Sequence, residues 1–387
     1  MQNKPGAIII EGHVQGLSNT RSLGEAGIPV IVVDKHNCIA RYSKYCRKFF
    51  KCPDFQSDAF ADFLMELGKR ENLQDWLLLP SNDHAVYNLA RNKSRLEEIY
   101  RVITPEIEVV NQIYNKENLL KNAARAHTPY PASWFPESFD EQVPEHLSFP
   151  VLIKGKFGLS FYKATGKKAF LVNHPSDFQE TMGRLSSIIQ AKDLFVQELI
   201  PFTVKNKTLS FAAFAVNGVI KAFWTGVKMR EHPIQFGTAT FAKSILEESV
   251  IDPSKRLLKQ LNYTGVCEVE YLQDPRDGEF KLIEINARTW LWVELARKCG
   301  VDFAQMAYKH VNQSIQEFPN TFTINYKWSN IWTDFVYALI AIFKGKLNLI
   351  AFLKSYNGRI MVAMFSRKDM LPFFIYPFLF LQFVRKR

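Results

Sequence analysis

Hydrophobic and polar positions follow two different patterns along the chain, and each pattern predicts a different architecture. In the first part, apolar runs at 7–10 and 28–33 flank a helical stretch at 17–26, and another apolar run follows at 76–80. Short, continuous apolar runs connected by helices are typical of parallel strands that are buried on both faces. The pattern therefore predicts an α/β, Rossmann-like domain, which we place at residues 1–112.

Polar loops follow two of these predicted strands. The turn Gly12-His-Val-Gln-Gly16 follows the first run, and Ser81-Asn-Asp83 follows the run at 76–80. Ligands bind at the carboxyl ends of strands in open α/β sheets. The glycines lack the GxGxxG spacing of a dinucleotide site. The sequence therefore favours a scaffold whose loop contacts another ligand over a dinucleotide-binding domain.

From residue 113 onward, helices and antiparallel strands alternate without internal repeats. The turn Asn217-Gly218 joins two apolar runs and is a strong hairpin signal. The segment 155–168 carries glycines and lysines and is predicted to be a flexible loop between two strands. We expect helices at 116–127, 176–191, 254–261 and 291–299, and strands at 150–154, 169–172, 194–200, 210–216 and 219–226. This part of the chain predicts a mixed α+β architecture.

The most informative stretch is a predicted antiparallel hairpin at 265–288, whose strands flank a Pro/Asp/Gly turn. Because side chains alternate along a strand, Glu268 and Glu270 share one face. On the returning strand, Glu284 and Asn286 share a face. If Glu270 pairs with Glu284, then Glu268 lies opposite Asn286, and all four side chains crowd one side of the hairpin. The other side is apolar.

Carboxylates crowded on one face repel each other by about 1 to 4 kcal/mol for a close pair, depending on the local dielectric. A bound cation would relieve this repulsion, and hard oxygen ligands without nearby His or Cys suit Mg²⁺. A solvated hairpin face is the alternative interpretation. Such faces usually mix Lys, Thr and Glu, whereas only Lys281, on the apolar-face parity, interrupts this set. From the hairpin alone, both interpretations stay open.

Composition narrows the possible classes of protein. The chain has 387 residues, 47% of them hydrophobic, which suffices for a large core and two or three domains. Its five cysteines are scattered and form no CxxC motif. This argues against a disulfide framework or a zinc site and fits a reducing compartment. No signal peptide is visible at the amino terminus, so we expect a cytoplasmic protein.

The net charge of +11 is concentrated at the carboxyl end. Nine Lys or Arg residues and one acid, Asp369, lie between 344 and 387, so the rest of the chain is close to neutral and no nucleic-acid partner is expected. The run 371–384 is almost entirely apolar but shorter than the roughly 20 residues that span a bilayer. Two interpretations remain open. The run is either a core-packed terminal helix or a peripheral contact with an anionic membrane, which residues 335–343 could join.

The order of these features resembles the ATP-grasp superfamily over roughly residues 7–310. Four features follow one another along the chain. The first two are lysines, Lys116 at the start of a helix and Lys154 on a strand before a glycine-bearing loop. The other two are the Gln-Glu-x-Ile-Pro strand end at 197–201 and the acidic hairpin with Glu-x-Asn-x-Arg at 284–288. Several other short sequence motifs resemble those of the D-aspartate ligase-type carboxylate–amine ligases in particular. They are Asn19-Thr-Arg-Ser-Leu-Gly24, Gly27-Ile-Pro-Val30, Ser43-Lys-Tyr45, Lys228-x-Arg230 with Pro233, Phe236-Gly-Thr-Ala-Thr240, Phe365-Ser366 and Leu371-Pro372.

The resemblance implies a division into three parts. A Rossmann-like pre-ATP-grasp domain at 1–112 would precede an ATP-grasp domain at 113–313. That domain would consist of subdomains 113–195 and 196–313, which hold ATP and one or two Mg²⁺ ions between them. A basic, aromatic segment at 314–387 would follow.

The resemblance also implies a role for each matched residue. Lysines would neutralise the α- and β-phosphates, the strand end would contact adenine, and the loop 155–168 would close over the triphosphate. An arginine would stabilise the transferring phosphoryl group with its fixed fork of donors. The implied residues are Lys116, Lys154, Gln197, Glu198, Leu199 and Ile200 for the nucleotide, Glu270, Glu284 and Asn286 for the metal with Glu268 behind them, and Arg288 for phosphoryl transfer.

A protein of this kind would join a small-molecule carboxylate, such as an amino acid, to an amine acceptor through an acyl phosphate. Lys228 and Arg230, with Arg21 from the first domain, are the candidates for binding the substrate carboxylate. The basic tail suggests a lipid-linked or envelope-bound acceptor, reached from the inner face of the membrane, and a homodimer is left open. The alternatives are an ATP-grasp ligase with a different nucleophile and a non-catalytic ATP-binding scaffold at the membrane.

The sequence departs from the family pattern in several places. Asn115 precedes the first lysine where the family often has Asp, and Ala287 stands where Pro is common. The segment 155–168 has fewer Gly and Ser residues than usual, and 203–207 offers no clear acid for the ribose hydroxyls. The ribose contact therefore stays unassigned.

Overall fold

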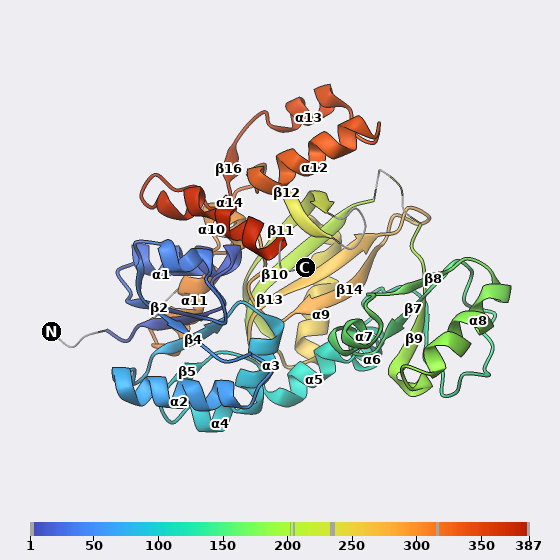
Figure 1. Cartoon of the computed structure of the whole chain (residues 1–387), viewed down its shortest axis with the longest axis horizontal. Helices are drawn as coiled ribbons and strands as arrows, with labels where there is room; N and C mark the ends of the chain where they lie inside the picture. The colour runs from blue at the N-terminus through green and yellow to red at the C-terminus, as the bar shows by residue number, and fades with distance from the viewer. Residues whose placement is uncertain (1–3, 202, 204–205, 233–236, 315–316, 385–387) are drawn as a thin grey trace.

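The computed structural model describes the chain except residues 1–3, 202, 204–205, 233–236, 315–316 and 385–387 (Figure 1). It contains one parallel sheet followed by two largely antiparallel sheets. The predicted order, an α/β domain and then a mixed α+β part, is confirmed. Three features that the sequence singled out, Pro233, Phe236 and the terminal Arg385-Lys-Arg387, lie outside the described residues.

The amino-terminal sheet is parallel, with strand order β3-β2-β1-β4-β5. Ile9 of β1 lies in one core with Leu17 of α1, and Ile8 lies in another core with Leu64 of α2. Both faces of the strand are therefore buried, which explains its continuous apolar run. The elements are β1 (Ala7–Ile10), α1 (Val14–Glu25), β2 (Val30–Asp34), β3 (Cys46–Lys51), α2 (Ala59–Glu71), β4 (Leu77–Pro80), α3 (Asp83–Arg91), α4 (Lys93–Leu96), β5 (Arg101–Val102) and α5 (Ile107–Tyr114).

The glycines after β1 are required for close packing. A Cβ atom on Gly12 would lie 2.3 Å from Cys38 Sγ, and one on Gly16 would lie 2.1 Å from the carbonyl oxygen of Glu11. The Gly12 N–H donates to Asp34 Oδ2 at 2.8 Å. These contacts explain both glycines without a bound dinucleotide, in agreement with the scaffold interpretation.

The second sheet is four-stranded, in the order β6-β9-β7-β8. The prediction of a flexible loop at 155–168 is wrong, because residues 158–165 form helix α7. Phe161 of this helix is buried in a core that also contains Ile153, and a Cβ on Gly155 would lie 2.3 Å from Phe161 Cβ. The glycines that suggested a loop therefore flank a helix. The elements are α6 (Lys116–Arg125), β6 (Ser133–Trp134), β7 (Val151–Gly155), α7 (Gly158–Thr165), β8 (Phe170–Val172), α8 (Pro175–Ser186) and β9 (Leu194–Glu198).

The third sheet has seven strands, in the order β14-β13-β10-β11-β12-β15-β16. The predicted Asn217-Gly218 hairpin is confirmed, with both residues at positive φ between β10 and β11. β15 and β16 extend the sheet beyond β12, so part of the carboxyl-terminal segment belongs to it. The elements are β10 (Thr208–Val216), β11 (Val219–His232), β12 (Thr238–Ser244), α9 (Ile251–Gln260), β13 (Gly265–Gln273), β14 (Phe280–Asn286), α10 (Val293–Lys298), α11 (Phe303–Val311), β15 (Lys327–Ser329) and β16 (Ile360–Val362).

Three more helices, α12 (Ile331–Phe343), α13 (Leu349–Ser355) and α14 (Leu371–Val384), complete the chain. Figure 1 shows α12 and α13 projecting from the top of the molecule. Tyr376 and Leu379 of α14 are buried in a core shared with the amino-terminal domain, as the core-packed interpretation of this run expects. Within the described residues, no helix combines the length and the apolar character needed to cross a bilayer.

Candidate active site

The acidic hairpin folds in the predicted register. β13 and β14 pair Glu268 with Asn286 and Glu270 with Glu284. Val269, which points to the other face of the hairpin, is completely buried in a core. The three carboxylates and the amide therefore share one face of the sheet, as the alternation of side chains requires.

Glu268 is the most deeply buried of the three carboxylates, with 3% of its surface exposed. Its Oε1 accepts a hydrogen bond from Ser210 Oγ at 2.5 Å, and its Oε2 accepts one from Asn286 Nδ2 at 3.0 Å. Burial, together with the charge of Glu270, raises the pKa of Glu268 to about 7. Burial in the first place, and the neighbouring negative charge in the second, therefore hinder ionisation of the innermost carboxylate of this face.

Lys228 of β11 reaches across β10 to this face. Its Nζ lies 2.6 Å from Glu270 Oε2, and both side chains are largely buried. Burial lowers the pKa of Lys228, but the charges of Glu270 and Glu268 raise it more, so the pKa lies above its ordinary value. The Lys228 ammonium group thus stays charged and partly compensates the carboxylates.

The two lysines predicted to bind phosphate converge on the outer end of the same face. Lys116 Nζ lies 3.7 Å from Glu284 Oε2 and donates to the carbonyl oxygen of Ile283 at 3.2 Å. Lys154 donates to Gln197 Oε1 at 3.0 Å. Burial and the neighbouring charge of Lys116 lower the pKa of Lys154 to about 8. Because the charge of Lys116 disfavours the charge of Lys154, an anion bound beside Lys154 would be stabilising.

The start of α6 explains how Lys116 is positioned. Asn115 is the N-cap, because its side chain accepts hydrogen bonds from the N–H groups of Glu117 and Asn118. Asn caps a helix as well as Asp does, so this departure from the family pattern leaves the local geometry intact. The Lys116 N–H donates to the carbonyl oxygen of Lys156 and ties the helix start to the end of β7.

Glu284 is the carboxylate of this face whose charged form is favoured by its neighbours. Burial raises its pKa, but the charges of Lys116, Lys228 and Arg288 lower that pKa more, so the pKa of Glu284 lies below its ordinary value. Glu284 thus carries its charge at neutral pH and is the most exposed carboxylate of the face, with 42% of its side chain exposed. It is the carboxylate best placed to meet a cation from solution.

Arg288 connects the hairpin with the amino-terminal domain. Its Nε and one terminal nitrogen donate to the two carboxylate oxygens of Asp83 at 2.9 and 2.8 Å. The same terminal nitrogen donates to Asn286 Oδ1 at 3.2 Å. Asp83 is the first residue of α3 and ends the polar stretch after β4 that the sequence marked as a ligand loop. The parallel domain and the acidic face therefore meet at this arginine.

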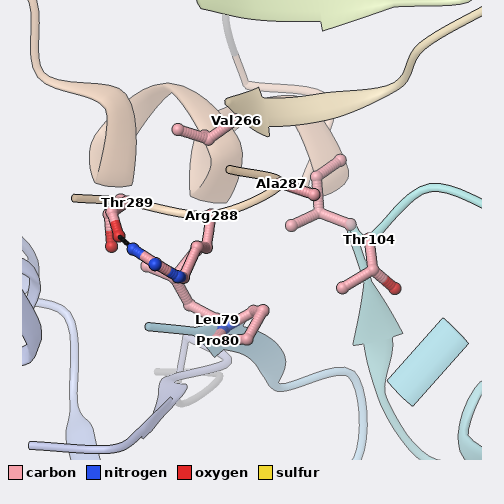
Figure 2. A pocket seen from close by; sticks show the side chains of 8 residues that line it. Leu79, Pro80, Thr104, Val266, Ala287, Arg288 and Thr289 are labelled. Atoms are coloured by element: carbon pink, nitrogen blue, oxygen red, sulfur yellow. Dashed lines mark hydrogen bonds between the residues drawn. The ribbon is translucent and has the colours of Figure 1, made fainter. Parts of the chain in front are cut away.

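Figure 2 shows the contact between β4 and the residues after β14, where Arg288 and Thr289 face Leu79 and Pro80. The cavity enclosed there has a volume of about 10 Å³, which is room for one water molecule. The elements are thus closely packed at this point.

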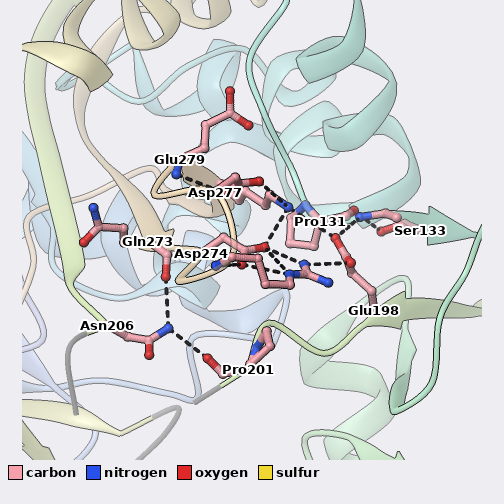
Figure 3. A network of polar contacts seen from close by, with 12 residues as sticks. Pro131, Ser133, Glu198, Pro201, Asn206, Gln273, Asp274, Asp277 and Glu279 are labelled. Carbon is pink, nitrogen blue, oxygen red and sulfur yellow. Dashed lines mark hydrogen bonds and ion pairs between the residues drawn. The ribbon is translucent and has the colours of Figure 1, made fainter. Parts of the chain in front are cut away.

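The predicted adenine-contacting strand end lies in a network of ion pairs (Figure 3). Glu198 Oε1 accepts from the Ala132 N–H at 2.9 Å, and Arg276 donates to Glu198 Oε2 at 2.8 Å. The Leu199 N–H donates to the carbonyl oxygen of Pro150 at 3.1 Å. Glu198 therefore fastens the four-stranded sheet to the turn of the acidic hairpin. The adenine contact of Gln197, Glu198, Leu199 and Ile200 stays a prediction.

Two predicted carboxylate-binding arginines already have protein partners. Arg230 donates from Nε and one terminal nitrogen to Asp334, at 2.9 and 2.6 Å, and from the other terminal nitrogen to Ser355 at 2.8 Å. Arg21 is buried and donates to Asp369 Oδ2 at 2.9 Å. Both contacts connect the body of the protein to the carboxyl-terminal segment, and a substrate would have to compete with a carboxylate for either arginine.

Sequence reasoning missed two charged groups near the site. Lys156 is almost completely buried, and its Nζ lies 2.6 Å from Glu117 Oε2, beside the two lysines that are predicted to bind phosphate. Glu11, directly after β1, adopts a φ of 70°, and burial together with the charge of Asp34 raises its pKa to about 7. Its Oε1 accepts from Asn82 Nδ2 at 3.0 Å. The position of Glu11 directly after a buried strand was the feature of the sequence that could have marked it as a candidate site residue.

The acidic face suits a metal ion that is shared with a ligand. Among the described residues, no three acidic, His or Cys side chains converge into a complete metal cage. Mg²⁺ commonly takes only one or two carboxylates from the protein and fills its remaining positions with water and phosphate oxygens. Glu270, Glu284 and Asn286 supply two carboxylates and an amide oxygen, and the crowded charge of the face favours a cation. The residues present therefore fit Mg²⁺ bound together with phosphates.

Comparison with known proteins agrees with this geometry. The family model for the carbamoyl-phosphate synthase L chain ATP-binding domain matches residues 229–315, which include the acidic hairpin. N5-carboxyaminoimidazole synthetase from Staphylococcus aureus, solved with ADP, superposes with a TM-score of 0.64 at 15% identity, over 84% of this chain and 81% of that one. The chain has the ATP-grasp fold.

Two further proteins that are similar to this chain are an L-amino acid ligase and a D-aspartate ligase. L-amino acid ligase from Bacillus licheniformis superposes with a TM-score of 0.61 at 13% identity, over 81% of this chain and 77% of that one. D-aspartate ligase from Enterococcus faecium is 23% identical over 252 residues. That alignment covers 61% of this chain and 59% of the relative, so the chain matches about three fifths of the length of this relative.

Proposed function

We propose that this ATP-grasp protein is an ATP- and Mg²⁺-dependent carboxylate–amine ligase that uses an amino acid as one of its substrates. The observation that carries the proposal is the convergence of charges from several elements on the hairpin face. Lys116 comes from α6, Lys228 from β11 and Arg288 from the end of the hairpin, and all three lie within reach of Glu284 or Glu270. Similarity to two amino-acid ligases supports the class of reaction.

The proposed reaction has two steps. A carboxylate oxygen of the first substrate attacks the γ-phosphorus of ATP, the bond to the β,γ-bridging oxygen breaks, and ADP leaves with the electron pair. The nitrogen of the amine substrate then attacks the acyl carbon of the resulting acyl phosphate. The carbon–oxygen bond breaks, phosphate leaves, and the nitrogen loses a proton. The protein mainly positions the reactants and balances their charge.

The side chains divide this work between them. Lys116 and Lys154 bind the anionic phosphates, which restores the charge that burial disfavours on Lys154. Lys228 orients the substrate carboxylate, and Arg288 offers its donors to the phosphoryl group in transit. Glu270, Glu284 and Asn286 would hold the metal, which when bound neutralises phosphate oxygens.

The acceptor is the finer part of the proposal. A lipid-linked or envelope-bound amine is supported by the basic and apolar end of the chain, where residues 344–387 contain nine Lys or Arg residues and one acid. Such an acceptor would be used from the cytoplasmic side of the membrane.

The test is ADP release by the purified protein, with and without Mg²⁺, across a panel of D- and L-amino acids and amine acceptors. Glu284→Ala should lower turnover by about 100- to 1000-fold, because the charge balance around the transferring phosphoryl group is lost. Glu279→Ala, an exposed acid at the turn of the same hairpin, is the matched control and should keep wild-type turnover. Unchanged turnover in Glu284→Ala would refute the metal assignment.

The same assay separates the alternatives. ATP binding without ADP release for any substrate pair would identify a non-catalytic scaffold. ADP release that requires a carboxylate but no amine would point to a different nucleophile.

A further inference from the structure

Helix α12 carries its apolar side chains on the outside of the molecule. Six large apolar residues recur at helical spacing along it and are all exposed to solvent. They are Trp332, Phe335, Val336, Leu339, Ile340 and Phe343, with exposures from 36% to 88%. Surface helices normally turn such a stripe toward the core. The orientation of α12 is therefore the reverse of that of an ordinary surface helix.

The opposite side of α12 explains why the helix does not rotate. Asp334 is completely buried and accepts hydrogen bonds from Arg230, Thr240 and Tyr356. Ala338, one turn further on, is also buried. Rotating the helix to bury the apolar stripe would expose Asp334 and leave Arg230 buried without its partner, which is costly. The outward apolar face is thus fixed by the fold.

The exposed apolar surface continues onto the neighbouring helices. Phe335 packs against Phe352 of α13 with ring centroids 6.2 Å apart, and Trp332 packs against Phe373 of α14 at 5.2 Å. Exposed side chains on α13 are Leu349, Ile350 and Leu353, and on α14 they are Leu371, Phe374 and Phe378. We call these residues, with the six of α12, the apolar face. The apolar face extends over three helices, whereas the exposed apolar residues of an ordinary protein surface are scattered singly.

The exposed charges that residues 331–384 contribute around the apolar face are all positive. Lys344 and Lys346 lie between α12 and α13, Lys354 lies on α13, and each is exposed. The only acids between 331 and 384 are Asp334 and Asp369, and both are buried in ion pairs with arginines of the protein body. The exposed part of this region therefore presents apolar groups flanked by uncompensated positive charge.

We propose that the apolar face is a membrane-binding surface that rests on an anionic phospholipid bilayer. Apolar side chains at the level of the acyl chains and lysines at the level of the phosphate groups match both layers of such a surface. The helices are too short to span a bilayer, which suits binding in the plane of the interface. α12 and α13 form most of this surface, whereas α14, for which the sequence left core packing and membrane contact open, buries Tyr376 and Leu379 in the core.

This surface also bears on the candidate active site. Asp334 of α12 holds Arg230, which lies two residues from Lys228 on the same strand. The apolar face is thus fastened directly to the strand that supplies a cation to the acidic hairpin. A lipid-linked acceptor would approach the site from a bilayer whose position relative to β11 is set by this contact.

The proposal is tested by co-sedimentation of the full chain with vesicles of phosphatidylcholine alone or mixed with phosphatidylglycerol, in the absence of ATP. The wild-type protein should bind the mixed vesicles and bind the neutral ones far more weakly. The variant Ile340→Glu/Phe343→Glu/Ile350→Glu should bind the mixed vesicles at least about 100-fold more weakly, since each lost apolar contact alone is worth a tenfold change or more.

The matched control is Leu171→Glu/Ile188→Glu/Val219→Glu, which makes the same charge change at residues of similar exposure on other elements. It should bind like the wild type. A second variant, Lys344→Gln/Lys346→Gln/Lys354→Gln, keeps the apolar face and should lose about fivefold in affinity for each lysine on anionic vesicles only.

Three results would overturn the proposal. They are wild-type protein that stays in the supernatant with anionic vesicles, equal losses in the test and control variants, and a dimer that dissociates in the test variant. The last result would show that a second copy of the chain covers the apolar face. ADP release in solution, measured without vesicles, should be the same in the wild type and the test variant. Failure of membrane binding is therefore distinguishable from failure of the proposed ligase reaction.

Discussion

Lys228 and Arg230 lie two residues apart on β11, and each forms a close ion pair, but the two pairs have very different surroundings. Asp334, the partner of Arg230, accepts two hydrogen bonds from the guanidinium group and one each from the hydroxyls of Thr240 and Tyr356. Each of its oxygens therefore has two donors. This carboxylate has little further capacity for a ligand.

Glu270, the partner of Lys228, shares its face with Glu268 and Glu284. There the negative charges crowd one another, and the pKa of Glu268 rises to about 7 because of burial and the charge of Glu270. Burial and distance are similar in the two ion pairs. The two ion pairs differ in the balance of donors and acceptors around the carboxylate. The oxygens of Asp334 have all the donors they need, whereas Glu270 lies among other carboxylates, where a further cation would be stabilising.

The largest expected effect concerns the pair that joins elements. Arg230→Ala leaves Asp334 buried without its cation and should lower the free energy of unfolding by about 3 to 5 kcal/mol. Urea denaturation followed by circular dichroism measures this loss. The double variant Arg230→Ala/Asp334→Ala removes both charges and should recover part of it. An Arg230→Ala variant that is as stable as the wild type but inactive would instead place Arg230 at the substrate carboxylate.

A smaller effect is expected for the other pair. Lys228→Ala should lower ADP release by about 100-fold, because one preorganised donor to the reacting groups is lost. Steady-state kinetics with the best substrate pair measures this change. Lys221→Ala, an exposed lysine on the same strand, is the control and should be silent. If the two lysine variants behave alike, Lys228 has no part in the reaction.

The smallest expected effect is a pH dependence of nucleotide binding. Burial and Lys116 lower the pKa of Lys154 to about 8, so Lys154 is charged below that pH and neutral above it. ATP favours the charged form, so affinity should fall as the pH rises through about 8 and be about tenfold weaker by pH 9. Lys154→Arg keeps its charge in this range, and titration calorimetry should show a flatter profile. Identical profiles for the two proteins would show that Lys154 does not contact the nucleotide.

The acidic hairpin could be predicted from the sequence because its geometry is local. Alternation along each strand places Glu268 on one face with Glu270, and Glu284 on one face with Asn286. The pairing of Glu270 with Glu284 was assumed, and in the structure it depends on a register shift next to Glu270. The helix α7 could not be predicted in the same way. Its glycines suggested mobility, but they lie at its ends, and burial of Phe161 against β7 favours the helix. A contact between elements thus outweighed the local composition.

Ion pairs between residues that are distant along the chain could not be predicted from the sequence. The role of Arg288 stays a prediction, and its ion pair with Asp83 joins residues 205 positions apart. Arg230 and Asp334 are separated by 104 positions. No pattern in the sequence indicates such pairings, because they depend on how whole domains pack.

The sequence by itself determined the parallel first domain and which side chains of each hairpin strand share a face. Only the tertiary structure decided which cation meets which carboxylate and to which side the apolar stripe of α12 points. The physical reason is the same in both cases. Periodicity fixes which side chains share a face, whereas the partner of that face depends on contacts such as Arg230 with Asp334, which hold α12 with its polar side inward.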